Sequence, residues 1–96
     1  MHIISRKALQ GFWEKHPDSE TPLKAWFKIV RGGKYTSLNH LRKTFPTADP
    51  VKGKIVFNIG GNKYRLIAVI HFKYAKVYIR RVMTHAEYDK GGWKNG

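Results

Sequence analysis

A histidine, a tyrosine and two carboxylates stand together in the segment VMTHAEYDK, Val82–Lys90. Histidine is the side chain that most readily accepts or donates a proton near neutral pH, so His85 could do either during a reaction. His85 and Tyr88 are three residues apart and would share one face if the segment formed a helical turn capped by Thr84. The pattern indicates one end of an acid–base site. The alternative is a structural cap in which the carboxylates only balance the two preceding arginines.

The charge of the chain indicates what such a site would act on. Nineteen lysines and arginines oppose six aspartates and glutamates, which gives a formal net charge of +13. Because 42% of the residues are hydrophobic and 14% aromatic, the composition is that of a folded domain. A folded domain with this charge is expected to bind a polyanion, most often nucleic acid. Cleavage of RNA through its 2′-OH needs a proton acceptor, a proton donor and cations around the phosphate.

Length and composition exclude several other classes of protein. The 96 residues predict a single domain, 1–96, with one modest core. The chain has no cysteine, which excludes disulfides and cysteine-based zinc sites. Without a signal-peptide pattern or an apolar run of membrane-spanning length, we expect a cytoplasmic protein with no membrane partner. Only Glu87 and Asp89 cluster among the carboxylates, and the histidines lack ligand spacing, so neither a metal site nor another cofactor is expected.

The first third of the sequence predicts a short edge strand followed by two helices. His2–Ile4 is a candidate strand, and Ser5 is a plausible N-cap for a first helix that Pro17 ends. Thr21-Pro22 is expected to start the second helix, whose apolar residues recur at helical spacing. Gly32-Gly33 is expected to end it. The two helices are expected to form an antiparallel hairpin.

The remaining sequence changes from helical to alternating periodicity. Residues 37–45 are expected to form a short helix, and residues 46–53, PTADPVKG, a loop. Gly60–Asn62 predicts a two-residue β-turn, and Tyr74-Ala75 a weaker second turn. The segments between these turns are rich in β-branched and aromatic residues, so they predict three antiparallel strands: KIVFNI, KYRLIAVIHF and AKVYIRRVM.

Alternation along these strands sorts their side chains onto two faces. One face is almost wholly apolar and is expected to pack on the two helices. Arg65 stands mid-strand on the other, basic face, where a guanidinium needs an anionic partner or an exposed concavity. With Asn58 and Tyr78, it is interpreted as a phosphate cradle with a stacking surface, although the lysines alone could be a solvated face. This basic face is expected to contain Lys54, Val56, Asn58, Lys63, Arg65, Ile67, Val69, His71, Lys76, Tyr78, Arg80 and Val82.

Two long stretches, VFNIGGNKYRLIAVI and YIRRVMTHAEYDK, resemble the HigB-type toxins within the RelE/ParE superfamily of bacterial toxin–antitoxin modules. The resemblance extends through HIISRKAL, LKAWFKIV and FPTADPV to nearly the whole chain. It implies an α+β, RelE-like fold in which two N-terminal helices pack on one face of a small, mainly antiparallel sheet. The implied order is β-α-α-β-β-β with a short C-terminal turn or helix.

The resemblance also implies a function and a set of residues. The resemblance implies a ribosome-dependent mRNA endoribonuclease that cuts in the A site, and a HigA-like helix-turn-helix antitoxin that neutralises it. Arg65 matches the position that contacts the scissile phosphate, His85 the region of a catalytic Arg or His, and Tyr88 that of a C-terminal aromatic. Contacts to mRNA and rRNA are expected from Lys54, Asn58, Lys63, Tyr78, Arg80 and Lys90.

Two other interpretations remain at this point. A non-catalytic nucleic-acid-binding module would explain the charge without using His85. A ParE-like toxin directed at DNA gyrase would share the scaffold but lack the acid–base residues, and MTHAEYD argues against it. The tail GGWKNG matches no motif.

Overall fold

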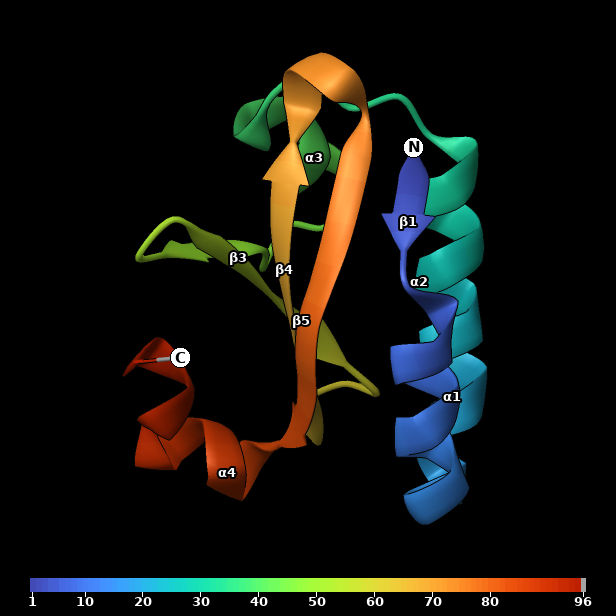
Figure 1. Cartoon of the computed structure of the whole chain (residues 1–96), viewed down its shortest axis with the longest axis vertical. Helices are drawn as coiled ribbons and strands as arrows, with labels where there is room; N and C mark the ends of the chain where they lie inside the picture. Colours follow the sequence, from blue (N-terminus) through green and yellow to red (C-terminus); the bar gives the residue numbers. More distant parts are fainter. Residues whose placement is uncertain (96) are drawn as a thin grey trace.

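A helical hairpin forms the first layer of the protein, whose computed structural model describes residues 1–95. Strand β1 (His2–Ile4) leads into helix α1 (Arg6–Lys15), and a 3-10 turn at Pro17–Ser19 joins α1 to helix α2 (Glu20–Gly32). The helices run antiparallel beside the sheet (Figure 1). Ser5 is the N-cap of α1 as expected, although its side chain makes no capping hydrogen bond. None of the helices in residues 1–95 is long and apolar enough to cross a membrane.

Helix α2 begins two residues earlier than the sequence predicted. Glu20 is its first residue and Ser19 its N-cap, so Thr21-Pro22 falls inside the first turn. Proline is tolerated there because the first four backbone N–H groups of a helix have no partner within the helix. The predicted end of the helix at Gly32-Gly33 is confirmed.

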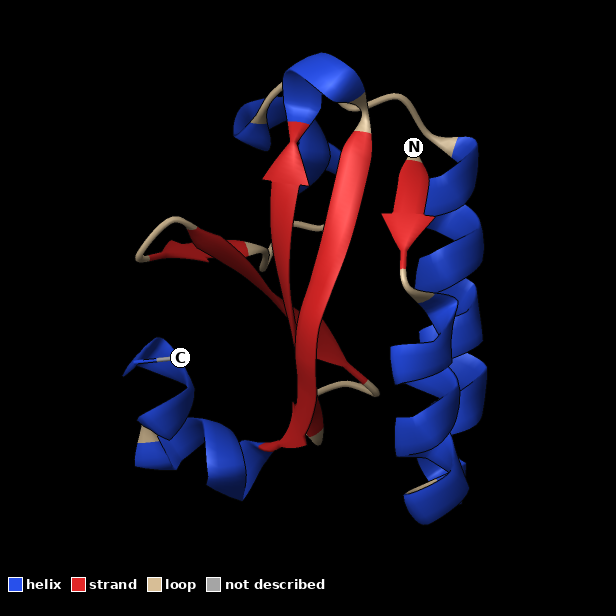
Figure 2. Cartoon of the chain, viewed as in Figure 1, coloured by secondary structure: helices blue, strands red, loops and turns tan. Residues whose placement is uncertain are grey.

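A five-stranded sheet forms the second layer, in the order β1-β5-β4-β3-β2. The pairing of β1 with β5 is parallel, and the other pairings are antiparallel. Figure 2 shows the sheet between α1 and α2 on one side and the C-terminal helix on the other, which confirms the predicted α+β class. The remaining elements are α3 (Leu38–Thr44), β2 (Asp49–Val51), β3 (Lys54–Ile59), β4 (Tyr64–His71), a 3-10 turn (Phe72–Tyr74), β5 (Lys76–Thr84), α4 (His85–Lys90) and a 3-10 turn (Gly92–Asn95).

Strand β2 corrects the expectation that residues 46–53 are only a loop. It pairs antiparallel with β3, so that Val51 lies opposite Lys54. The two residues between them, Lys52 and Gly53, have φ values of 50° and 79°, the positive values that a type I′ hairpin turn requires. Pro50 is compatible with β2 because β2 is an edge strand, where a residue without an N–H is tolerated.

The turn between β3 and β4 has the register predicted for a two-residue turn centred on Gly61-Asn62. Ile59 pairs with Tyr64, so four residues, 60–63, lie between the two strands, and the Lys63 N–H donates to the Gly60 carbonyl at 3.5 Å. Four is an even number, and the alternation of faces therefore continues across the loop as expected. Asn58 still lies opposite Arg65. Lys63 leaves the strand and belongs to the loop.

A β-bulge changes the predicted alternation in β5. Ile67 pairs with Arg81 but the next residue, Ala68, pairs with Ile79, so Arg80 is an extra residue in the strand. Beyond the bulge every side chain of β5 changes face. The expectation that Val82 lies on the basic face is therefore wrong, because Val82 packs against the core beneath the helices.

Two apolar clusters lie on opposite faces of the sheet. The larger one fills the space between the sheet and the helices, and its fully buried members include Leu9, Leu23, Leu41, Phe57 and Leu66. The smaller cluster consists of Val56, Ile67, Met83 and Trp93. Part of the face that was predicted to be basic is therefore an apolar floor, and the tryptophan of the unmatched tail covers it. Gly96, the last residue of the expected domain, lies outside the described residues.

A polar contact joins the helical hairpin to the sheet. The carboxylate of Asp18 accepts a hydrogen bond from the Tyr64 hydroxyl and one from Lys63 Nζ at 3.2 Å. The bond from Tyr64, followed by that from Lys63, lowers the pKa of Asp18 below its ordinary value of 3.8. The bond to Asp18 raises the pKa of Tyr64.

We expect Asp18→Asn to lower the melting temperature at neutral pH. A carboxylate whose pKa is lower in the folded state stabilises the fold above its unfolded pKa, and this contribution disappears as the pH falls through the folded pKa. The difference in melting temperature between the wild type and Asp18→Asn should therefore have its full size well above pH 3.8 and should shrink at lower pH. Thermal unfolding at several pH values measures this, with Asp49→Asn on exposed β2 as the control. A difference that does not change with pH would contradict the assignment.

Candidate active site

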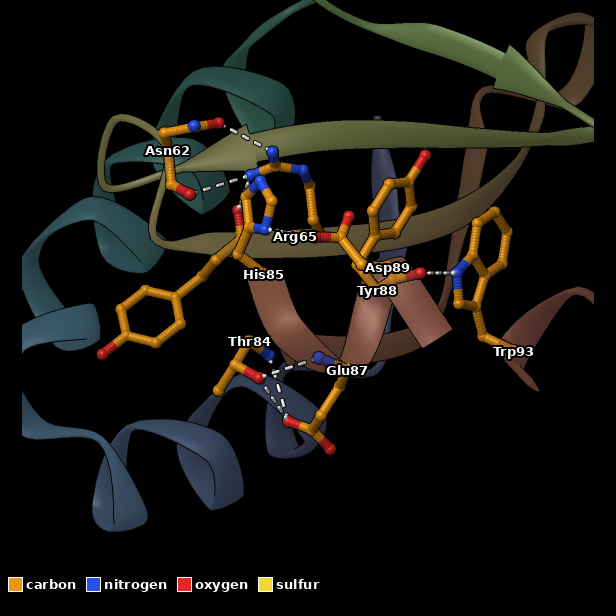
Figure 3. Close-up of polar contacts among 9 residues, drawn as sticks. Asn62, Arg65, Thr84, His85, Glu87, Tyr88, Asp89 and Trp93 are labelled. Carbon is orange, nitrogen blue, oxygen red and sulfur yellow. Dashed lines mark hydrogen bonds and ion pairs between the residues drawn. The ribbon is translucent and has the colours of Figure 1, made fainter. Parts of the chain in front are cut away.

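Arg65 is a buried cation held only by neutral groups. It lies in β4 with 7% of its surface exposed. Its Nη1 donates to the carbonyl oxygens of Tyr64 (3.1 Å) and Asn62 (3.3 Å), and its Nη2 donates to Asn62 Oδ1 at 2.7 Å (Figure 3). The guanidinium carbon lies 5.4 Å from the centre of the Tyr88 ring. No carboxylate among residues 1–95 forms an ion pair with Arg65. Its charge is therefore available to an anion that binds beside it.

Helix α4 starts at the end of β5 through a capping box. Thr84 Oγ1 accepts from the backbone N–H of Glu87 at 3.2 Å, and Glu87 Oε1 accepts from the N–H of Thr84 at 3.1 Å. The bond from the Thr84 backbone is the main reason that the pKa of Glu87 is lowered. Gly91 ends the helix in the left-handed conformation, at φ 74°, which favours glycine. The predicted cap at Thr84 is confirmed, and Glu87 pairs with Thr84 instead of balancing an arginine.

The imidazole of His85 is oriented by a carboxylate. His85 Nδ1 lies 2.9 Å from Asp89 Oδ2, one helical turn further along α4. If Nδ1 carries the proton of this contact, Nε2 has a free lone pair that can accept one. The backbone N–H of His85 donates to the carbonyl of Lys63 at 2.9 Å, in the same loop whose Asn62 holds Arg65. One loop therefore anchors both the guanidinium and the imidazole.

Tyr88 lies between the guanidinium and the tail. Its ring stacks on the indole of Trp93 with 5.1 Å between centroids and 17° between planes. Its other neighbour is the Arg65 guanidinium. Figure 3 shows Tyr88 and Trp93 side by side, with the indole nitrogen bonded to the backbone of Tyr88.

A basic hollow of about 200 Å³ lies on the same face of the sheet. Its lining contains three cations, Lys54, Arg80 and Arg81, together with Ile67 and Trp93. Two consecutive residues of one strand normally point to opposite faces, but the bulge allows Arg80 and Arg81 to line the same hollow. A neighbouring hollow of about 260 Å³ shares Arg81 and Trp93 and also contains Lys90.

The structure brings together some of the predicted site residues and separates others. Arg65, His85 and Tyr88 meet where α4 joins the sheet, and Lys54, Arg80 and Lys90 line the adjacent hollows. Lys63 forms an ion pair with Asp18 beside the helical hairpin. Asn58 is exposed next to α2, and Tyr78 lies toward the other end of β5, against His71.

Sequence reasoning missed Asn62, Asp89, Arg81 and Trp93. The spacing of four between His85 and Asp89 is the helical signal that could have indicated their contact. The bulge that turns Arg81 toward the site left no such pattern. Within residues 1–95, no three side chains of the metal-binding types come together to hold an ion.

A sheet with helices on one face and a cationic site on the other is the arrangement expected of a RelE-like toxin, and comparison with known proteins agrees. Residues 19–91 match the model of the HigB toxin family, described as the RelE-like toxic component of a toxin-antitoxin system. An mRNA interferase toxin HigB of Escherichia coli K12 is 41% identical over 92 residues, which cover 93% of this chain and 88% of the relative.

Two further relatives have the name mRNA interferase HigB. The protein of Shigella flexneri has the same identity and coverage as that of strain K12. The protein of Escherichia coli O6:H1, strain CFT073, is 30% identical over 93 residues, covering 94% of this chain and 90% of the relative. This chain therefore belongs to the HigB toxin family.

We expect Thr84→Ala to destabilise the C-terminal helix. Loss of an N-cap side chain typically costs about 1 kcal/mol of unfolding free energy. Without the side-chain bond, the pKa of Glu87 should also move toward its ordinary 4.5. Urea unfolding and an NMR titration of Glu87 measure the two effects. Thr21→Ala, an exposed position of α2, is the control and should change neither value. An unchanged pKa of Glu87 would contradict the capping box.

Proposed function

We propose that this protein is an mRNA interferase, an endoribonuclease that cleaves messenger RNA in the ribosomal A site and so stops translation. The observation that carries the proposal is the buried Arg65 guanidinium, which has only neutral partners among the described residues and lies beside a helix that presents a His85–Asp89 pair. The names of three relatives, each an mRNA interferase, support the same activity.

The cleavage chemistry uses the residues already in place. The 2′-oxygen of the ribose attacks the adjacent phosphorus, and the bond from phosphorus to the 5′-oxygen of the next nucleotide breaks. Arg65 stabilises the negative charge that develops on the pentacoordinate phosphate. His85 exchanges a proton with one of the two oxygens, the 2′-OH or the leaving 5′-oxygen, and Tyr88 or water with the other, while Asp89 orients the imidazole. The proposal requires no resident metal ion, since these side chains supply both the charge and the proton transfer.

The basic hollow is proposed to hold the phosphates that flank the cleavage point. Lys54, Arg80 and Arg81 converge on it from two strands, and none of them forms an ion pair within residues 1–95. Phosphates of mRNA or of the surrounding rRNA would neutralise this charge. Because the substrate is on the ribosome, we place the activity in the cytoplasm.

The partner that controls this activity follows from the family. A toxic component of a toxin–antitoxin system has an antitoxin as its partner. We propose that this antitoxin is HigA-like, with a helix-turn-helix domain.

The first test is cleavage of message in cells that express the protein. Primer extension should show new cuts in translated messages from cells that express the wild-type protein. His85→Ala should lower turnover by about two to four orders of magnitude, the scale of acid–base catalysis, while ribosome binding remains almost unchanged. Arg65→Ala should weaken both binding and turnover. Lys28→Ala, on the exposed side of α2, is the control. If messages stay intact while cells that express the wild-type protein stop growing, the proposal is refuted. A folded His85→Ala protein with full activity would refute the role of His85.

A second test separates the basic hollow from the rest of the cationic surface. Loss of one phosphate contact should reduce the slope of log affinity against log salt by about 0.7 on single-stranded RNA. We expect this for Lys54→Ala and Arg81→Ala in ribosome-binding titrations. Lys63→Ala should change the slope less, because Lys63 is paired with Asp18. If Lys63→Ala has the larger effect, the RNA does not pass through the hollow.

A further inference from the structure

The C-terminal turn returns the tail of the chain to the functional site. After Gly91 ends α4, the 3-10 turn at Gly92–Asn95 brings Trp93 back toward the sheet. The indole packs against Val56, Ile67 and Met83, and only 3% of the Trp93 surface is exposed. An indole that is covered to this extent cannot itself stack on an RNA base. Apart from the wall that it contributes to the basic hollow, Trp93 can therefore influence the reaction only through a neighbouring residue.

Tyr88 is the neighbour that Trp93 contacts in two ways. The two rings are stacked 5.1 Å apart, and Trp93 Nε1 donates to the backbone carbonyl oxygen of Tyr88 at 3.1 Å. The stack restricts rotation of the Tyr88 side chain, and the hydrogen bond fixes its backbone. Because the strands β3, β4 and β5 each supply one side chain around the indole, this support rests on the sheet.

Tyr88 in turn lies against Arg65. The guanidinium carbon is 5.4 Å from the centre of the Tyr88 ring, a cation–π distance. Asn62 and the Tyr64 carbonyl hold the guanidinium through its hydrogen bonds. The ring contact supplies a constraint that the hydrogen bonds do not. The three groups thus form a column in the order Arg65, Tyr88, Trp93.

We propose that Trp93 is a positioning residue of the cleavage site, which holds the Tyr88 ring and, through it, the Arg65 guanidinium where the scissile phosphate binds. This inference rests on the proposed function. Loss of the indole leaves one face of Tyr88 unsupported, so its ring can move away from the guanidinium. A shift of about 1 Å in a catalytic group can reduce turnover by roughly a hundredfold.

Two substitutions of Trp93 test the role of its ring. Trp93→Phe keeps a ring that can stack, and Trp93→Leu keeps apolar bulk without one. We expect Trp93→Leu to lower kcat for cleavage of ribosome-bound message roughly tenfold to a hundredfold, and Trp93→Phe to retain most of the activity. Trp13→Leu removes a similarly buried tryptophan from α1, outside the site, and is the matched control for lost stability. All rates are taken per folded molecule, below the melting temperature of each variant.

Coupling to Tyr88 distinguishes a positioning role from a purely structural one. In a Tyr88→Leu background, Trp93→Leu should reduce kcat little further, because the column is already broken. Trp13→Leu should have the same effect in both backgrounds. Equal effects of Trp93→Leu in the two backgrounds, or full activity of Trp93→Leu alone, would overturn the proposal. If the wild type cleaves no message, the proposed function fails and the positioning role fails with it.

The wild-type fold provides a test that does not depend on a variant. Protein labelled with 5-fluorotryptophan is titrated with a short 2′-O-methyl RNA, which carries the phosphates but cannot be cleaved. Binding at Arg65 should shift the fluorine signal of Trp93 and leave that of Trp13 in place. If Trp93→Leu does not fold, this measurement is the one that tests the positioning role of Trp93. A Trp93 signal that stays unchanged while the RNA is bound would overturn the inference.

Discussion

The buried guanidinium of Arg65 is the constraint on which the rest of the site depends. A charge removed from water is costly unless other groups replace the lost solvation. Here neutral oxygens and the Tyr88 ring replace part of it, and no carboxylate cancels the charge within residues 1–95. Apart from the Tyr64 carbonyl in β4 itself, these partners come from the β3–β4 loop and from α4, so both elements must be held beside β4. The capping box and the bond from His85 to the loop accomplish this.

The bulge at Arg80 organises the second face of the sheet. It turns Val82 toward the large core and Met83 toward the small one, so each of the two clusters receives an apolar side chain from the same strand. It also places two consecutive arginines around one hollow. A regular strand would have directed one of them toward the helices. The one extra residue therefore determines both which side chains of β5 pack in the two clusters and where its arginines lie.

Sequence reasoning predicted the features that depend on local patterns. Strand β3, the cap at Thr84 and the order of the helices and strands other than β2 follow from periodicity and capping chemistry, and they are confirmed. The bulge could not be predicted, because the sequence pattern of β5 does not mark which residue is the extra one. Trp93 follows two glycines and has no periodic neighbours, so nothing indicated that it packs on the sheet. The roles of Arg65, His85 and Tyr88 stay predictions, although the structure places them together.

The two edge strands of the sheet affect how readily the protein self-associates. A sheet edge offers unpaired N–H and C=O groups on which another strand can assemble. Both edges here are short, since β1 and β2 have three residues each, and β2 includes a proline, which has no N–H to offer. The high like charge of neighbouring chains adds mutual repulsion. The fold thus combines an anion-seeking surface with edges that are poor templates for aggregation.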